Sequence, residues 1–314
     1  MAENTVKKIA TRESYGNSLK ELAEEFPNLV VLDADLAAAT KTGIFRKAYP
    51  DRHIDCGIAE ENMMGVAAGL SLVGKIPFVS SFAMFAAGRA FDQLRNTVGY
   101  PHLNVKIGAT HAGITVGEDG ATHQCNEDIA LMRTIPGMVV MCPSDDVEAR
   151  AAVRAALEYE GPVYIRFGRA AVPVINDHPG YHFEIGKGTV VREGKDVTIV
   201  ATGICVDSAL GAAKMLEEEG ISAEVVNICT IKPLDEEIIL NSAKKTGKVV
   251  TVEEHSVIGG LGSAVCDCLC AHYPVPVKKV GMQDVFGESG SAAALVEKYG
   301  LDAKGVYKSV KEFL

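Results

Sequence analysis

The chain has 314 residues, of which 47% are hydrophobic and 23% are charged, so it is long enough for two domains and has an ordinary globular composition. Its net charge of −10, from 31 basic and 41 acidic residues, argues against a protein that binds nucleic acid or an anionic membrane. The N-terminus has no apolar core of the signal-peptide kind, and no run of about 18 apolar residues predicts a transmembrane helix, so we expect a cytoplasmic protein.

Short apolar strands alternate with helix-period segments through the first half of the chain, a pattern typical of parallel α/β architecture. Strands are predicted at 29–33, 76–80, 104–109, 138–142 and 163–167, and helices at 62–72 and 147–158. The strands are nearly continuous apolar runs, as expected where helices cover both faces of a sheet. We therefore expect a doubly wound α/β domain over residues 1–175, with a mainly parallel sheet.

A second series of alternating strands and helices is predicted after a segment of different composition. Residues 171–187 contain two prolines, two glycines and two histidines with little periodicity, and predict a linker. Further strands are predicted at 196–201, 223–228, 248–253 and 277–280, with helices at 207–219, 235–246 and 262–271. We expect a second doubly wound domain over residues 186–314.

The eight cysteines are scattered and show no pair of CxxC motifs of the zinc-binding kind. Cys266, Cys268 and Cys270 lie two residues apart, so they cannot all share one face of a helix. Free, buried thiols in a reducing cytoplasm are therefore favoured over a metal site.

The first segment that suggests chemistry is 55–62 (DCGIAEEN), which follows a short strand and opens a helix rich in small residues. A carboxylate at such a strand end, among apolar neighbours, is partly desolvated, and desolvation raises the pKa of a carboxyl group. Glu60 can then share a proton with a ring nitrogen at neutral pH. The alternative is that Glu60 and Glu61 simply favour a helix N-terminus.

The next segment, 80–85 (SSFAMF), contains two of the ten phenylalanines and follows a predicted strand. This position is the carboxyl end of the sheet, where open α/β sheets bind ligands. The faces of Phe82 and Phe85 can therefore stack on a heteroaromatic ring. The alternative is that both are core residues at helical spacing.

The glycine-rich segment 110–124 (THAGITVGEDGATHQ) also follows a strand, and it places His111, Asp119 and His123 within thirteen residues. Loops after parallel strands often carry catalytic groups. Two histidines and one aspartate make a poor metal site without a further nearby ligand. Hydrogen-bonding and proton-transfer groups for a hydroxylated substrate fit better.

Together these motifs resemble the transketolase family. IAEEN followed by AAGL, SSFAMF, GEDGATHQ and PSD occur in the family's order and at similar spacings, and IKPLDEE, VEEHSVIGGLGSAV and FGESG resemble its C-terminal domain. The resemblance spans nearly the whole chain. It implies a pyrimidine-binding domain followed by a transketolase C-terminal domain, with thiamine diphosphate as the cofactor. It further implies the C-terminal subunit of a two-piece transketolase, which moves a two-carbon ketol unit from a ketose phosphate to an aldose phosphate.

The resemblance assigns cofactor roles to several residues. It implies that Glu60 contacts N1′ of the aminopyrimidine ring and that Phe82 and Phe85 line the pocket for that ring. Ile58 matches a position that supports the bent shape of the cofactor, and Asp35 matches an acidic residue near it.

The resemblance also assigns the substrate contacts. His123 and Asp119 match positions that face the hydroxyls of the ketose donor. Arg12, His111 and Arg169 match a group that receives the substrate phosphate. Guanidinium groups grip phosphate through two hydrogen bonds, so this set is chemically suitable in itself. The alternative is that the two arginines form surface ion pairs.

One position departs from the family pattern at the phosphate end. Many transketolases have a serine where this chain has Ala39, although Thr40 and Thr42 are close.

The segment that holds Mg²⁺ and the diphosphate in this family, GDG followed by asparagine, is absent from the sequence. The EDG at 118–120 has no fitting asparagine downstream, and Mg²⁺ prefers an octahedral set of oxygen ligands. We therefore expect an N-terminal transketolase subunit to supply the GDG segment and the Mg²⁺ site, in an α₂β₂ assembly in which this chain also pairs with itself. This chain should be inactive alone.

Three other interpretations stay open. The β subunit of a 2-oxo acid dehydrogenase E1 component has the same layout, but more often carries an HSQ-type segment where this chain has DGATHQ. Deoxyxylulose phosphate synthases share some motifs, but normally have arginine in place of His111 and form one continuous chain. A non-catalytic assembly subunit is disfavoured because Glu60, Asp119 and His123 are all retained.

Overall fold

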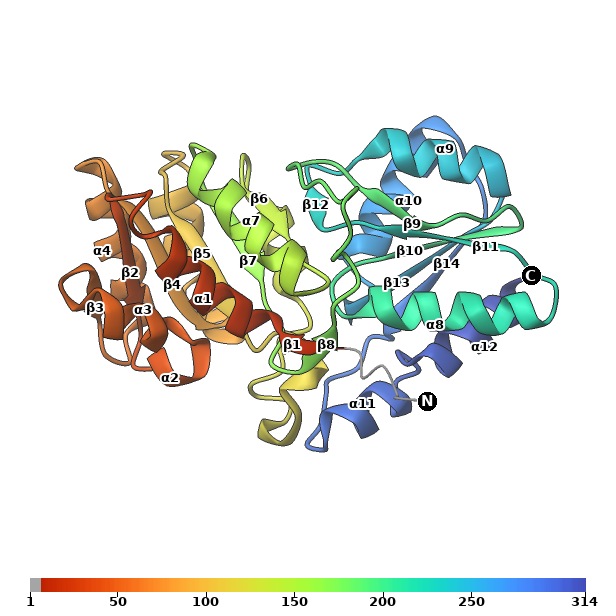
Figure 1. Cartoon of the computed structure of the whole chain (residues 1–314), viewed down its shortest axis with the longest axis horizontal. Helices are drawn as coiled ribbons and strands as arrows, with labels where there is room; N and C mark the ends of the chain where they lie inside the picture. The colour runs from red at the N-terminus through yellow and green to blue at the C-terminus, as the bar shows by residue number, and fades with distance from the viewer. Residues whose placement is uncertain (1–6) are drawn as a thin grey trace.

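The computed structural model describes residues 7–314, so the first six residues of the predicted first domain lie outside the described residues. Figure 1 shows two sheets side by side, each covered by helices. A short antiparallel ribbon of β1 (Lys8–Ala10) and β8 (Ala171–Pro173) lies between them (Figure 1). The chain is thus an α/β protein with two mainly parallel sheets, which confirms the predicted fold class.

The first sheet has seven strands in the order β12-β6-β7-β5-β4-β2-β3. Their bounds are Leu29–Asp33 (β2), His53–Asp55 (β3), Ile76–Phe82 (β4), Lys106–Thr110 (β5), Val139–Met141 (β6), Val163–Arg166 (β7) and Thr230–Lys232 (β12). The five strands predicted in the first half are all present. The edge strand β12 was not predicted, because it comes from the second half of the chain and pairs antiparallel with β6.

Helices cover both faces of this sheet because its strands are apolar on both sides. In β2, Leu29 and Val31 pack in one core with α1 (Thr11–Leu22), α3 (Thr42–Ala48) and α7 (Asp146–Glu158). Val30 and Leu32 point to the opposite core, as strand geometry requires. The elements packed in that core are α4 (Glu60–Leu72), the helical segments η2 (Met84–Arg89) and η3 (Leu94–Gly99), and α6 (Asp128–Arg133). Shorter segments are α2 (Ala37–Thr40), η1 (Pro50–Arg52), α5 (Phe91–Gln93) and η4 (Ile114–Asp119).

The second sheet has five strands in the order β14-β13-β10-β11-β9. They span Thr189–Arg192 (β9), Val197–Ala201 (β10), Ala223–Asn227 (β11), Val249–Ser256 (β13) and Val277–Met282 (β14), with β9 antiparallel to its neighbour. In Figure 1, α8 (Cys205–Glu218) and α12 (Ala303–Phe313) lie on one side of this sheet, and α9 (Glu236–Thr246) and α10 (Leu261–His272) lie on the other. The last helix before α12 is α11 (Ala292–Lys298).

The predicted linker is more ordered than its composition suggests. Its first residues form β8, in which Val172 is buried opposite Ile9. Asp145 then accepts hydrogen bonds from the backbone amides of Ile175 and Asn176, each at 2.8 Å. The PSD segment therefore fixes the connection between the two sheets.

All eight cysteines carry free thiols, and five of them are buried. Cys270 is exposed, whereas Cys56 and Cys266 are half-buried. Across residues 7–314, no helix combines the length and apolar character needed to cross a bilayer.

Candidate functional site

Most of the predicted site residues lie at one edge of the first sheet. Strand β2 leads to Asp35, β3 leads to Glu60, β4 ends at Phe82, and His111 directly follows β5. These strands are parallel, so their carboxyl ends meet at the same edge. The order of motifs along the sequence therefore becomes a cluster in space.

Glu60 is the first residue of α4, and its side chain is 3% exposed. The sequence predicted apolar surroundings, but the structure adds a cation. Nη1 of Arg89 donates to both carboxylate oxygens of Glu60, at 2.9 and 3.0 Å. The guanidinium of Arg89 also lies over the ring of Phe85, 4.5 Å from its centroid. Sequence reasoning missed Arg89 because nothing in its own segment marks it.

The aromatic residues form a continuous series of ring contacts. Phe82 stacks on His111, with ring centroids 3.9 Å apart, and on Phe85, with centroids 5.8 Å apart. His123 meets the ring of Phe85 edge-on, at 5.4 Å. The structure thus brings four predicted residues from two segments, 80–85 and 110–124, into direct contact.

The side chains of Ile58 and Asp35 are exposed, and Ile58 is 77% exposed despite being apolar. Asp55 fixes the backbone beside both residues. Its Oδ1 accepts hydrogen bonds from the amide of Asp35 at 3.2 Å and from that of Gly57 at 2.9 Å. Asp35 adopts a left-handed conformation (φ 59°), which aspartate tolerates better than most residues. Asp55 is therefore a positioning residue that the sequence motif contained but did not single out.

Arg12 and His111 are in direct contact. Nη1 of Arg12 lies 3.1 Å from Nε2 of His111 and 2.9 Å from the carbonyl oxygen of Ala39, to which it donates. Burial, followed by the positive charge of Arg12 and Arg169, lowers the pKa of His111 to about 3. The imidazole is therefore neutral near pH 7. Because arginine can only donate, Nε2 of His111 accepts and Nδ1 carries the proton toward Thr110, 2.9 Å away.

Arg169 lies at the other side of the glycine-rich loop. Its guanidinium donates to the carbonyl oxygen of Val116 and forms an ion pair with the exposed carboxylate of Glu118 at 3.0 Å. Its positive charge also lowers the pKa of Arg12, after the larger effect of burial. The three residues predicted to receive a phosphate thus lie within one positive region.

Contacts from both domains hold the loop that carries Asp119 and His123. Nε2 of Gln124 donates to the carbonyl oxygens of Ile114 and Gly117, both at 3.2 Å, and to that of Glu288 at 2.8 Å. Asp119 is exposed, and among the described residues no hydrogen bond or ion pair joins its side chain to the cluster. Its carboxylate can therefore accept hydrogen bonds from a ligand at the surface of the loop.

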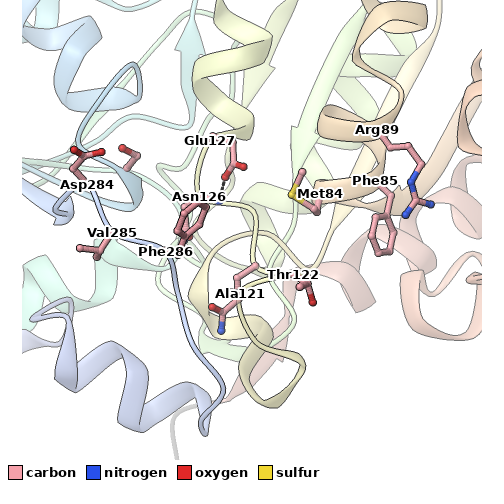
Figure 2. A pocket seen from close by; sticks show the side chains of 12 residues that line it. Met84, Phe85, Arg89, Ala121, Thr122, Asn126, Glu127, Asp284, Val285 and Phe286 are labelled. Atoms are coloured by element: carbon pink, nitrogen blue, oxygen red, sulfur yellow. Dashed lines mark hydrogen bonds between the residues drawn. The ribbon is translucent and has the colours of Figure 1, made fainter.

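A pocket of about 680 Å³ opens beside the cluster, between the two domains. Figure 2 shows Phe85 and Arg89 together at one end of the pocket, and Asp284, Val285 and Phe286 at the other. Ala121 and Thr122, from the loop that carries His123, lie between these two ends (Figure 2).

The donor set fits the aminopyrimidine half of thiamine diphosphate. Such a ring requires a carboxylate near N1′ and apolar contacts on its faces. Glu60 supplies a buried carboxylate, Phe85 a half-buried ring, and Ile58 an exposed apolar side chain nearby in sequence. Each carboxylate oxygen can accept more than one hydrogen bond, so Arg89 leaves acceptor capacity on Glu60.

The diphosphate end of the cofactor requires a metal ion and its ligands. Within residues 7–314, no group of three or more His, Cys, Asp or Glu side chains is arranged to hold a metal ion. The location of the Mg²⁺ site stays a prediction.

Comparison with known families gives two matches that together cover most of the chain. Residues 7–174 match the transketolase pyrimidine-binding domain, and residues 186–306 match the transketolase C-terminal domain. The boundaries predicted from sequence, 1–175 and 186–314, stay predictions at the level of single residues.

Individual proteins resemble the chain over nearly its full length. It is 52% identical to a putative transketolase C-terminal section from Methanocaldococcus jannaschii, covering 96% of this chain and 95% of that protein. It is 49% identical to a 6-deoxy-6-sulfo-D-fructose transketolase subunit from a Clostridium strain, covering 96% and 93%. Among solved structures, a split-gene transketolase described as an inactive β4 tetramer matches with a TM-score of 0.89 and 57% identity, covering 98% of both chains.

Proposed function

This chain belongs to the transketolase family, and we propose that it acts as the C-terminal subunit of a two-piece, thiamine diphosphate-dependent transketolase. In this proposal the assembled enzyme transfers a two-carbon ketol unit from a ketose phosphate to an aldose phosphate. The similarity to transketolase subunits over the full length supports a transferase that needs a partner subunit.

One observation carries the proposal from family to chemistry. The ring of Phe82 contacts the rings of both Phe85 and His111. It therefore joins the aromatic region beside Glu60 to the positive region around Arg12. A ketose phosphate has two groups that match these two regions: a carbonyl that reacts at the cofactor and a phosphate at its far end.

The cofactor, when bound, supplies the nucleophilic carbon that attacks the ketose carbonyl and stabilises negative charge there. In the proposal, Glu60 holds a proton at N1′ of the aminopyrimidine, which Phe82 and Phe85 contact. His123 orients the donor oxygens and exchanges protons with them, and its edge contact with Phe85 keeps it beside the ring.

The remaining residues are proposed to select the substrate. Asp119, exposed on its loop, discriminates between hydroxyl configurations by accepting hydrogen bonds. Arg12 and Arg169 bind the phosphate, and the neutral imidazole of His111 orients Arg12. Ile58 and Asp35 complete the cofactor side, held by the backbone that Asp55 fixes.

We further infer that an N-terminal transketolase subunit supplies the diphosphate and Mg²⁺ site. The absence of a GDG segment from the sequence supports this division. The solved relative described as an inactive β4 tetramer supports self-pairing of this chain and inactivity without the partner.

The test is an activity assay with xylulose 5-phosphate, ribose 5-phosphate, thiamine diphosphate and Mg²⁺. We expect no turnover from the chain alone and turnover after co-expression with a subunit that carries the GDG segment. Failure of a properly assembled complex would contradict the proposal, and 2-oxo acids would then be assayed for an E1-type reaction.

Glu60→Gln is expected to lower kcat of the assembled complex about 100-fold or more, because a carboxamide cannot exchange a proton with N1′. Glu61→Gln, at the exposed neighbouring position, is the matched control and should retain most of the activity. Retention of most of the rate by Glu60→Gln would refute the assigned role of Glu60.

A further inference from the structure

The positive region around Arg12 contains charge that this chain does not neutralise. None of the ion pairs within residues 7–314 includes Arg12 or Lys41. Nε of Arg12 is buried and has no hydrogen-bond partner among the described residues. A buried donor without a partner is unfavourable unless a ligand satisfies it, so these groups indicate an anion site.

Lys41 is held beside Arg12 by the packing of α1. Arg12 and Gly16 lie one helical turn apart, and therefore on the same face of α1. Gly16 abuts Lys41 so closely that a Cβ on Gly16 would collide with the carbonyl oxygen and Cβ of Lys41. Arg12 itself donates to the carbonyl oxygen of Ala39, two residues before Lys41. The turn that carries Lys41 is thus fastened to the same helix face at two points.

The backbone of Lys41 is also unusual. Lys41 ends α2 and precedes α3 in a left-handed conformation, with φ 72° and ψ 5°. Such a conformation is uncommon for a residue with a long side chain and is often found at functional sites. The side chain is half-buried, and its charge contributes to the positive field that lowers the pKa of His111.

The two threonines beside Lys41 cannot supply the hydroxyl that Ala39 lacks. Oγ1 of Thr40 donates to the carbonyl oxygen of Leu36 at 3.0 Å and lies 3.0 Å from Oγ1 of Thr42. Oγ1 of Thr42 lies 3.2 Å from Oδ2 of Asp33, to which it donates. Both threonines are fully buried, so their hydroxyls serve the turn itself.

We propose that Lys41 is a specificity-determining residue, whose ammonium contacts the terminal tetrahedral oxyanion of the sugar in place of the hydroxyl missing at Ala39. This inference rests on the proposed function. An ammonium acts as a compact point charge, so it makes fewer geometric demands on the anion than a hydroxyl or a guanidinium. The chemistry it recognises is shared by a phosphate ester and a sulfonate. One similar protein is a subunit of a transketolase for a 6-deoxy-6-sulfo sugar.

The first experiment measures binding and needs no turnover, because Arg12, Lys41, His111 and Arg169 all belong to this chain. The full chain is titrated by ligand-observed NMR with ribose 5-phosphate, with 5-deoxy-5-sulforibose and with ribose. We expect the wild type to prefer the anionic sugars. Lys41→Met keeps the length of the side chain and should weaken anionic-sugar binding about 10- to 100-fold, as for loss of one charge-assisted hydrogen bond, with ribose unaffected. A loss confined to one anionic sugar identifies the anion that Lys41 contacts.

Two variants control for folding and for general charge. Lys41→Arg retains a cation and should recover most of the binding. Lys47→Met removes an exposed lysine from α3 and should behave as wild type. Equal binding of the phosphate by wild type and Lys41→Met would overturn the inference, as would equal weakening of ribose and ribose 5-phosphate.

The assembled complex separates the two proposals. Lys41→Met should raise KM for ribose 5-phosphate by a similar factor while kcat and the constants for ribose change little. If the wild-type complex transfers no ketol unit but the chain shows Lys41-dependent phosphate binding, the proposed function fails and the anion contact stands. If transfer occurs and KM for ribose 5-phosphate is unchanged in Lys41→Met, the assignment of Lys41 fails alone.

Discussion

Glu254 of β13 connects the second domain to the loop that carries Asp119 and His123. Its Oε1 accepts a hydrogen bond from the backbone amide of Thr115 at 2.6 Å, and both groups are buried. Glu254→Leu replaces the carboxylate with an apolar side chain of similar size, so that amide loses its acceptor. A hydrogen bond to a charged group contributes about 1.5–3 kcal/mol, so opening of the loop should become about 10- to 150-fold more frequent.

The assay is hydrogen–deuterium exchange of the peptides that cover 111–124, followed by kinetics of the assembled complex. Glu253→Leu is the matched control, because neighbouring residues of a strand point to opposite faces. Glu253 instead accepts from the amides of Leu261 and Gly262, at 2.7 and 2.8 Å, where α10 begins. We expect fast exchange in the loop for Glu254→Leu and at α10 for Glu253→Leu.

Glu254→Gln restores a neutral acceptor for Thr115 and should recover part of the protection. Only Glu254→Leu should lower kcat/KM, since a loosened loop no longer positions His123. If the loop peptides exchange equally slowly in both leucine variants, the second domain does not hold the loop, and the reasoning from this contact is wrong.

Two further predictions concern the pH dependence of stability, each read from urea unfolding of a variant beside the wild type. Folding lowers the pKa of His111 from 6.5 to about 3. Between these two values the unfolded chain binds a proton at His111 and the folded chain does not, so acidification favours unfolding. The free energy of unfolding should therefore fall by about 3 kcal/mol between pH 7 and pH 4. His111→Gln should remove this part of the slope; an unchanged slope would contradict it. The buried Lys106 has its pKa lowered from 10.5 to about 7, so stability should rise by about 4 kcal/mol from pH 7 to pH 10, and Lys106→Met should flatten that rise.

The sequence predicts the parallel architecture well because it depends on local patterns. Strands covered on both faces are nearly continuous apolar runs, as in β2, where only the last residue, Asp33, is charged, and the chain then alternates between strand and helix. The edge strand β12 could not be predicted in this way. Its pairing with β6 joins residues about ninety positions apart, and such a contact leaves no periodic signal in either segment.

The same contrast between local patterns and distant contacts decides which site residues the sequence could predict. Phe82, His111 and His123 were identified from motifs that follow strands, and parallel strands bring such positions together. Arg89 and Lys41 were not, because their importance depends on distant partners. Arg89 contacts Glu60, 29 positions away, and Lys41 packs against Gly16 of α1. A motif marks residues by their local pattern, whereas a role that depends on contacts between distant segments is recognisable only after folding.

The division of labour between the two proposed subunits follows from where this chain places exposed and buried groups. The carboxylate of Glu60 is buried and already bound by Arg89, so this half of the site is organised before any ligand arrives. Ile58, by contrast, exposes an apolar side chain two residues away, which is unfavourable in water. A partner that covers Ile58 would gain apolar contact there. Assembly would then complete the site without rearranging it, because the groups that need to be ordered are held within this chain.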